Sequence, residues 1–304
     1  STVLAVLSRT PSMFLVAVAL AHAPSRLAVH GISSVFSRAQ PLFASATGVE
    51  PPALLRVSHT VPSIDPVASF YEACFGLQRA ESANADGCKV LVSPKGGHQS
   101  LQLELVADAQ GGFQAEGGYQ GLSARCGDVG ATVSMVAANG GSVLSDTGEV
   151  IHGASLVPEQ DEKNKNSVMQ ALVADPSGYP ILLYQACEGG AEHALLSAVR
   201  LNVYEWKESQ KWYESTIGWS TLRWQSNVPL EASITVTVGP PGLKDSVGPC
   251  GPTGDEAGAV IQLRYEYGCD KMKQKGGLKA IALSDSGASG DVHEDPDGYR
   301  LTLA

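Results

Sequence analysis

Apolar and polar residues alternate along residues 54–60, Leu-Leu-Arg-Val-Ser-His-Thr, with the two-residue period of a half-buried strand. The period then lengthens, because an apolar stripe of helical spacing runs from Val67 to Cys74. Asp65-Pro66 is a typical helix start and Gly76 a typical helix stop. Strand-like runs follow at residues 77–82, 88–93 and 100–107. The first unit is therefore predicted to be a strand, a helix and three strands.

The same order of elements returns after residue 120. Helices are predicted over residues 128–138 and 206–216, each followed by Gly residues that end it. The interval 239–258 is rich in Gly and Pro, so we expect a long loop there. Further strands are predicted at residues 121–126, 142–145, 167–173, 179–185, 195–203, 219–225, 232–238, 259–265, 278–283 and 299–304.

Two short motifs occur twice. Phe-Tyr-Glu-Ala-Cys-Phe-Gly at 70–76 returns as Trp-Tyr-Glu-Ser-Thr-Ile-Gly at 212–218, and Asp-Pro-Ser-Gly-Tyr at 175–179 returns as Asp-Pro-Asp-Gly-Tyr at 295–299. A pattern that repeats in the same order indicates an internal duplication. The chain therefore contains two related halves.

These units, an early His-Thr strand and the repeated Asp-Pro-x-Gly-Tyr motif resemble the glyoxalase I (lactoylglutathione lyase) branch of the vicinal oxygen chelate superfamily, in its fused two-domain form. The resemblance covers residues 54–304. It implies an α+β fold of tandem β-α-β-β-β modules paired into curled sheets. We expect an N-terminal arm at 1–50 and domains at 51–190 and 191–304, with a truncated last module, because Gln262 and Asp295 are much closer in sequence than Glu104 and Asp175.

The resemblance also implies where a metal would bind. In the family, each site takes a His and a Glu from the first module of one domain, and a His or Gln and a Glu from the second module of the other. His59 and Glu104 match the first pair and are the vestigial ligand candidates, with Gln262 a weak one at the second site. The remaining ligand positions fall on Ala280 (or Lys279 with a one-residue slip), Thr302, Ala198, Gly121 or Leu122, and Leu182.

Most of these residues cannot ligate a metal, so no cofactor is expected. If the chain is active, the resemblance implies a divalent ion, Zn or Ni. A second interpretation of His59 is a half-buried strand residue that hydrogen-bonds Glu104. His293 and Glu294 are adjacent, so a strand would point their side chains to opposite faces, and we expect them in a surface loop.

Composition agrees with two globular domains. The chain has 304 residues, of which 43% are hydrophobic and 17% charged. Its net charge is −10, although residues 1–49 contain three arginines and no acid. The acidic remainder argues against nucleic acid as a partner. The six cysteines show no Cys-x-x-Cys spacing and are expected to be buried or free thiols.

The first fifty residues are expected to be a targeting sequence. An apolar run at 13–23 is too short to span a bilayer, and an acid-free tract with Ser, Arg and Ala follows it. This order resembles the two-part presequences of plastid proteins. The alternative is a retained arm that docks on a partner or on a membrane interface, without a transmembrane helix.

Three functions remain open. The preferred hypothesis is a glyoxalase-like protein that has lost metal-dependent catalysis and serves as a structural or docking subunit of a plastid complex, with an exposed surface of Trp206, Trp219 and Trp224 as its contact. The second is an active lactoylglutathione lyase that uses His59 and Glu104. The third is a metal-free binder of small molecules. The chain has no Gly-rich phosphate-binding motif and no Gly-x-Ser-x-Gly.

Overall fold

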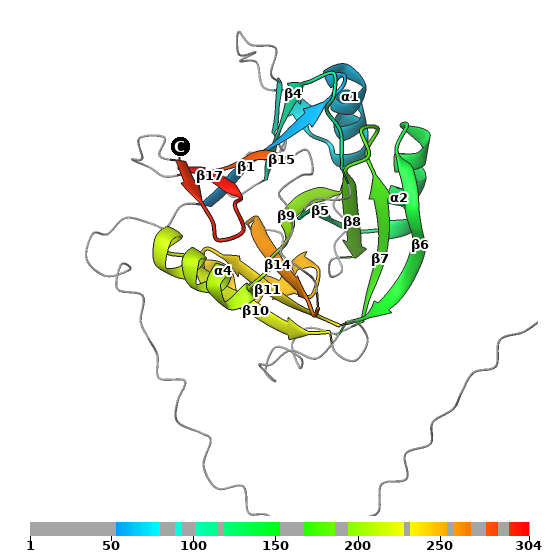
Figure 1. Cartoon of the computed structure of the whole chain (residues 1–304). Coiled ribbons are helices and arrows are strands. Elements are labelled where there is room, and N and C mark those ends of the chain that lie inside the picture. Colours follow the sequence, from blue (N-terminus) through cyan, green and yellow to red (C-terminus); the bar gives the residue numbers. More distant parts are fainter. Residues whose placement is uncertain are drawn as a thin grey trace, which may run out of the picture. The chain divides into compact units, whose positions relative to one another are not determined.

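The structure is a computed structural model, shown in Figure 1. It describes residues 53–79, 89–92, 101–114, 118–152, 167–185, 194–227, 232–253, 258–268, 278–284 and 292–303. The expected N-terminal arm at 1–50 lies outside these residues, as do Cys88, Cys187 and Cys269.

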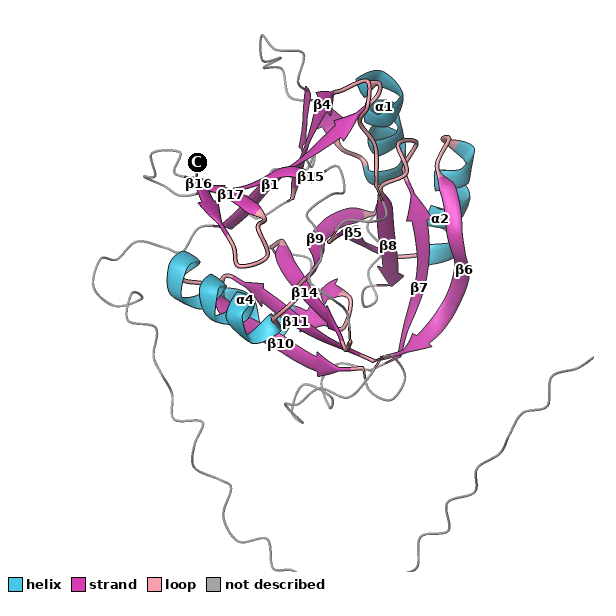
Figure 2. Cartoon of the chain, in the orientation of Figure 1, coloured by secondary structure: helices cyan, strands magenta, loops and turns pink. Residues whose placement is uncertain are grey.

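Strands dominate the described residues (Figure 2). The helices are α1 (Ile64–Phe75), α2 (Val129–Ala138) and α4 (Trp206–Trp212), with a π-helix, η1, at Tyr213–Ile217 and a 3-10 helix, η2, at Pro241–Ser246. The strands of the first half are β1 (Ala53–Val61), β2 (Gln78–Arg79), β3 (Lys89–Val92), β4 (Gln102–Ala107), β5 (Tyr119–Cys126), β6 (Ser142–Ile151), β7 (Ser167–Ala174) and β8 (Pro180–Gln185). The strands of the second half are β9 (Leu195–Asn202), β10 (Ser220–Ser226), β11 (Ser233–Gly239), β12 (Val247–Gly248), β13 (Gly251–Pro252), β14 (Val260–Glu266), β15 (Leu278–Ser284), β16 (Val292–Glu294) and β17 (Arg300–Leu303).

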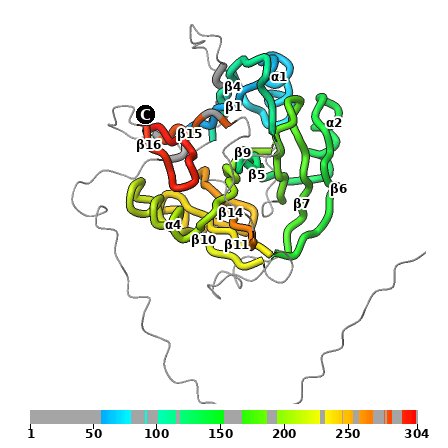
Figure 3. Tube along the Cα trace, viewed as in Figure 1, coloured from blue at the N-terminus to red at the C-terminus, as the bar shows by residue number. Residues whose placement is uncertain are grey.

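The strands form two large sheets, each built from two modules. The seven-stranded sheet has the order β16-β17-β15-β1-β4-β3-β2 and joins the first module to the last. The eight-stranded sheet has the order β10-β11-β14-β9-β5-β8-β7-β6 and joins the third module to the second. Figure 3 shows the consequence, because β1 and β15 come from opposite ends of the described chain and lie side by side. The expected α+β fold of paired modules is confirmed.

Helices α1, α2 and α4 pack against one apolar core. Phe70 and Tyr71 of α1 lie in the same buried cluster as Val57 and Leu103, whose side chains lie on the helix-covered side of β1 and β4. Side chains alternate between the two faces of a strand, so Ser58 and Glu104 lie on the opposite face. Each large sheet therefore has two different faces. The core face packs against the helices, and the opposite face, the inner face, can carry polar residues.

Gly residues end two of these helices as predicted. Gly76 closes α1 with φ 60°, and Gly218 follows η1 with φ 77°, both in the left-handed region that disfavours side chains. Asp128 caps α2, because its Oδ1 accepts the N–H of Ala131 at 2.9 Å. The expected cap of α1 is wrong by two residues, since the helix begins after Ser63 and Asp65 lies in its first turn.

Two expectations need correction. The interval 239–258 is not only a loop, because it contains η2 and the short β12–β13 pair. His293 and Glu294 lie on the edge strand β16, not in a loop, although they do occupy successive positions and so point to opposite faces. The described part of the last module, residues 278–284 and 292–303, contains β15, β16 and β17.

The expected tryptophan surface is also wrong. Trp219 is only 1% exposed, and Trp206, Trp212 and Trp224 are partly buried against the main core. Trp206 and Trp224 contact each other edge to face with ring centroids 5.3 Å apart. These indoles fill the space between α4 and the core face of its sheet, where burial of large apolar area is favourable.

Candidate functional site

The repeated motifs meet each other in two matching clusters. In the first Tyr–Asp cluster (Tyr71, Asp175 and Tyr179), Asp175 Oδ2 accepts the Tyr71 hydroxyl at 3.1 Å, and its Oδ1 accepts the backbone N–H of Tyr179 at 2.9 Å. The Tyr179 hydroxyl then donates to the carbonyl of Thr60 on β1 at 2.8 Å. The first motif of one module is thus hydrogen-bonded to the second motif of the next.

The second Tyr–Asp cluster (Tyr213, Asp295 and Tyr299) repeats this arrangement. Asp295 Oδ2 accepts the Tyr213 hydroxyl at 3.1 Å, and Oδ1 accepts the N–H of Tyr299 at 2.8 Å. The Tyr299 hydroxyl donates to the carbonyl of Asn202 on β9 at 2.9 Å. The duplicated motifs therefore have a structural role: they fix the helix and the first strand of each half to the following module.

The two clusters also align the two halves residue by residue. Thr60 of β1 and Asn202 of β9 accept equivalent tyrosine hydroxyls, so they are equivalent positions. Two residues earlier, Ser58 corresponds to Arg200. The sheet register agrees, since Ser58 lies beside Glu104 and Arg200 lies beside Gln262.

The inner face of the seven-stranded sheet carries Ser58, Glu104 and their neighbours. The Ser58 hydroxyl donates to Glu104 Oε2, and Arg56 Nη1 lies 3.6 Å from Glu104 Oε1. Ala280 lies in register with Ser58, and Thr302 with Ala282. Of the four inner-face positions that could hold ligands, only that of Glu104 carries a carboxylate; the others carry Ser58, Ala280 and Thr302. The charge of Glu104 faces that of Arg56.

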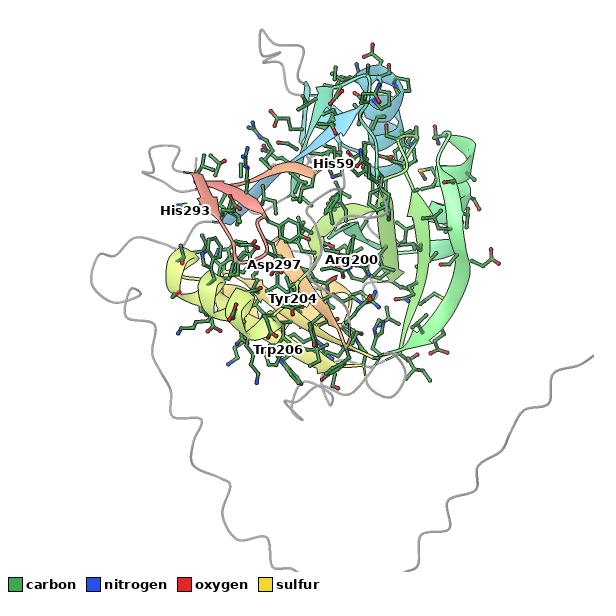
Figure 4. All side chains as sticks on the ribbon, viewed as in Figure 1. His59, Arg200, Tyr204, Trp206, His293 and Asp297 are labelled. Atoms are coloured by element: carbon green, nitrogen blue, oxygen red, sulfur yellow. The ribbon has the colours of Figure 1, made fainter. Side chains whose placement is uncertain are left out.

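The structure does not bring His59 and Glu104 together. The imidazole lies on the core face, fully buried, with Nε2 2.6 Å from the Tyr119 hydroxyl and its ring stacked on Tyr179 at a centroid distance of 3.9 Å (Figure 4). Among the described residues, Nδ1 has no hydrogen-bond partner. Burial lowers the pKa of His59 to about 3, so the ring is neutral at physiological pH.

Both sequence-based interpretations of His59 therefore need the same correction. Successive strand residues point to opposite faces, so the expected contact with Glu104 is wrong and Ser58 occupies the position beside the carboxylate. The sequence could have predicted this orientation. Residues 57, 59 and 61 lie on the same face of a strand, so His59 points the same way as the apolar Val57 and Val61 and away from the face of Arg56. A metal on Glu104 would have to bind without that imidazole.

The inner face of the eight-stranded sheet has a different set of groups. Arg200 occupies the position that corresponds to Ser58, so the assignment of Ala198 to that position is wrong by two residues. Gly121 lies in register with Arg200, and Leu182 lies in register with Ser123. Gln262 is engaged on both sides, since its Oε1 lies 3.5 Å from the Ser123 hydroxyl and its Nε2 donates to the carbonyl of Pro249 at 3.2 Å.

These residues do not fit a divalent metal of the expected kind. Zinc and similar ions bind three or four imidazole, thiolate or carboxylate ligands that converge on one point. One face offers a hydroxyl, a carboxylate, Ala280 and Thr302; the other offers a guanidinium, an amide, Gly121 and Leu182. Within the described part of the chain, no group of three or more His, Cys, Asp or Glu side chains could hold an ion.

The fold was compared with known proteins. The Zea mays glyoxalase I crystal structure aligns with a TM-score of 0.63 and 19% identity, covering 84% of this chain and 92% of that one. A putative dioxygenase from Bacillus subtilis aligns with a TM-score of 0.52 and 11% identity over 84% of this chain and 85% of that chain. The chain has the glyoxalase/vicinal oxygen chelate fold.

In sequence, this glyoxalase-fold chain is 23% identical over 258 residues to the probable lactoylglutathione lyase, chloroplastic, of Arabidopsis thaliana. The match covers 82% of the chain but 63% of the relative, so the chain spans less than two thirds of that protein's length. No family model matches the chain. In the described residues, no helix is both long and apolar enough to cross a membrane.

Proposed function

We propose that this glyoxalase-fold chain has lost metal-dependent lyase catalysis and acts as a docking subunit in a plastid. The observation that carries the first part is the residue set beside Glu104: Ser58, Ala280 and Thr302 stand where imidazole and carboxylate ligands are needed. Proton transfer between adjacent carbons requires a carboxylate base as well as a bound ion. Glu104 is the one carboxylate among these four positions, and Arg56 Nη1 lies 3.6 Å from its Oε1.

The plastid location rests on two observations. The Arabidopsis relative is named as chloroplastic, and residues 1–49 have the acid-free, arginine-containing composition of a presequence. Peripheral attachment to a plastid membrane belongs to the same proposal. Import of the full chain, fused to a fluorescent protein, into isolated plastids tests the location, and removal of residues 1–50 should abolish import.

The docking role rests on an exposed apolar edge. The β6 surface is formed by Val143, Leu144, Val150, Ile151 and Met169. Leu144 is 51% exposed and Ile151 67% exposed, and β6 is the last strand of its sheet, with β7 as its described neighbour. An edge strand with apolar side chains favours an extended apolar segment of a partner protein. The partner segment would pair along the free edge of β6, beside the side chains on both faces of this strand.

The proposed loss of metal-dependent lyase activity is tested on the purified full chain. We expect less than a tenth of an equivalent of bound Zn or Ni after incubation with either ion, and no lactoylglutathione from the methylglyoxal–glutathione hemithioacetal. Stoichiometric metal together with product formation that Glu104→Gln abolishes would refute the proposal and establish the alternative, an active lyase.

The docking part is tested by hydrogen exchange on the complex isolated from plastids. We expect amides of residues 142–151 to be protected in the complex and not in the free chain. Leu144→Lys should prevent assembly, whereas Val292→Lys, at an even more exposed apolar residue of β16, should not. Assembly that is unaffected by Leu144→Lys would contradict the assignment of this surface.

A further inference from the structure

The second Tyr–Asp cluster has a link to its helix through a further carboxylate. Asp297 lies in the turn between β16 and β17 and accepts two hydrogen bonds from the segment that begins α4 (Figure 4). Its Oδ1 accepts the backbone N–H of Tyr204 at 2.7 Å, and its Oδ2 accepts the Ser209 hydroxyl at 2.7 Å. Ser209 is fully buried. One carboxylate thus ties the turn of the last module to the start of a helix in the third module.

The corresponding residues of the first half cannot form this link. In the alignment that the tyrosine contacts give, Tyr204 corresponds to Pro62 and Ser209 corresponds to Val67. Proline has no N–H and valine has no hydroxyl, so neither could donate to a side chain of the turn. Ser177 takes the place of the turn carboxylate. All three members of the link therefore differ between the halves, which indicates a feature particular to the second half.

A second carboxylate of the same turn contacts the same helical segment. Asp295 is 4% exposed, and its Oδ1 accepts the backbone N–H of Asp297 at 3.0 Å and that of Tyr299 at 2.8 Å. Its Oδ2 accepts the hydroxyl of Tyr213, in η1, at 3.1 Å. Asp297 therefore holds the turn to the start of α4, and Asp295 holds it to η1, which continues that helix.

The two carboxylates are close enough for the charge of one to oppose the ionisation of the other. Burial, followed by the charge of Asp297, raises the pKa of Asp295 to about 7. The phenols of Tyr213 and Tyr299 also face Asp295, and burial raises the pKa of both, so they stay neutral near pH 7. Asp295 therefore gains its charge near neutral pH, beside a second carboxylate.

The charged residues around this turn have balanced signs. The segment that begins α4 contains Glu205, Lys207 and Glu208, and Arg300 directly follows the turn. Two of these residues are acidic and two are basic, so together they add no net charge. The charge of the turn itself therefore changes with pH against a background of zero net charge.

We propose that the turn at residues 295–299 is a pH-sensitive latch, which holds the last module on the α4–η1 helix while Asp295 is protonated and opens more often once both carboxylates are charged. The sign follows from proton binding. Opening exposes Asp295 to water, where its pKa returns towards 3.8, so the closed latch binds the proton more tightly than the open one. The closed latch is therefore most stable at low pH, and its stability falls as pH rises to about 7. The latch involves neither β6 nor the residues beside Glu104, so it is independent of the proposed function.

Amide hydrogen exchange of the full chain, resolved by NMR, tests the latch at the Tyr204 N–H. We expect the protection factor of this amide, corrected for the intrinsic pH dependence of exchange, to fall about tenfold or more between about pH 5.5 and about pH 7.5. The Asn202 N–H donates to the carbonyl of Gly118 at 2.6 Å, outside the latch, and is the reference that should change less. A protection factor at Tyr204 that does not vary with pH, or that varies only in parallel with Asn202, overturns the proposal.

Variants separate a pH-sensitive latch from a merely structural contact. Asp295→Asn keeps an oxygen acceptor for the backbone N–H groups and removes the titrating group, so protection at Tyr204 should become independent of pH over the same range. Asp175→Asn, the matched change in the first half, should leave the pH profile at Tyr204 as in the wild type. If Asp295→Asn does not fold, Asp297→Asn removes the neighbouring charge, keeps an oxygen for the Tyr204 N–H, and should move the fall in protection to lower pH. A wild-type pH profile in folded Asp295→Asn, or in Asp297→Asn, refutes the latch.

Discussion

The two inner faces are built on the same frame and carry opposite chemistry. Ser58 and Glu104 of the seven-stranded sheet correspond to Arg200 and Gln262 of the eight-stranded sheet, and each pair is aligned by an identical tyrosine hydrogen bond to its first strand. One face holds a carboxylate paired with Arg56; the other holds arginines and amides. The difference shows that the frame of this fold does not depend on what the inner face carries.

The largest expected effect comes from breaking the shared frame. Asp175→Ala and Asp295→Ala each remove a buried acceptor of two backbone N–H groups and a tyrosine hydroxyl, and each should lower the free energy of unfolding by about 3–5 kcal/mol. Chemical denaturation of both variants measures the change. Asp65→Ala, at an exposed carboxylate, is the control and should cost less than about 1 kcal/mol. Similar losses in all three variants would show that the buried Tyr–Asp clusters stabilise the fold no more than an exposed carboxylate does.

The second comparison concerns His59 and its equivalent Leu201, both fully buried on the core face. The pKa of His59 is lowered from 6.5 to about 3, so the unfolded chain binds a proton more readily between these values. The neutral ring makes its full contribution to the free energy of unfolding above pH 6.5, and this contribution is lost as pH falls towards 3.

His59→Leu should therefore become relatively more stable than the wild type on acidification, by on the order of 3 kcal/mol between pH 7 and pH 4. Differences in free energy of unfolding between the two chains at each pH isolate this residue from the other titrating groups. Leu201→Val, at the equivalent position of the other half, is a control and should give a difference that does not vary with pH. A pH-independent difference for His59→Leu would contradict the buried neutral imidazole.

Much of the fold was predictable from local patterns. The alternation in β1 and the helical stripe in α1 gave elements close to those observed, because both depend on one buried face. The duplicated motifs indicated two related halves, and the family resemblance implied the pairing of modules. Neither predicted that the motifs touch, since Tyr71 and Asp175 are brought together only by tertiary structure. The short β12–β13 pair was missed because Gly and Pro carry little strand signal.

The site was predicted less well than the fold. The motif placed His59 at the ligand position, although the alternation of β1 assigns it to the same face as Val57. Arg200 was missed because its equivalence to Ser58 depends on the tyrosine contacts at Thr60 and Asn202, which no local pattern encodes. The burial of Trp219 likewise depends on how α4 packs against its sheet.

A smaller effect distinguishes the two Tyr–Asp clusters from each other. Burial raises the pKa of Asp175 to about 6; burial, together with the charge of Asp297, raises that of Asp295 to about 7. Ser177 stands where the second cluster has Asp297. Asp297→Ser should therefore lower the pKa of Asp295, by no more than about one unit. Carboxyl resonances followed by NMR against pH measure it.

The sign of the accompanying stability change follows from the direction of these shifts. A raised carboxyl pKa means that the folded chain holds the proton more tightly, so each cluster is most stable below pH 3.8 and loses stability as pH rises to its folded pKa. Asp297→Ser should lower the pH at which that loss of stability is complete for Asp295. An unchanged titration of Asp295 would mean that the charge of Asp297 does not contribute to its raised pKa.

The smallest expected effect comes from making the first inner face resemble the second. Glu104→Gln keeps a hydrogen-bond acceptor for the Ser58 hydroxyl and removes the charge that faces Arg56 across 3.6 Å. Because Arg56 is partly exposed and water can replace the lost partner, the free energy of unfolding should fall by less than about 1 kcal/mol. A loss above about 3 kcal/mol, measured by denaturation, would show that Glu104 holds the seven-stranded sheet together and that the two faces are not equally dispensable to the frame.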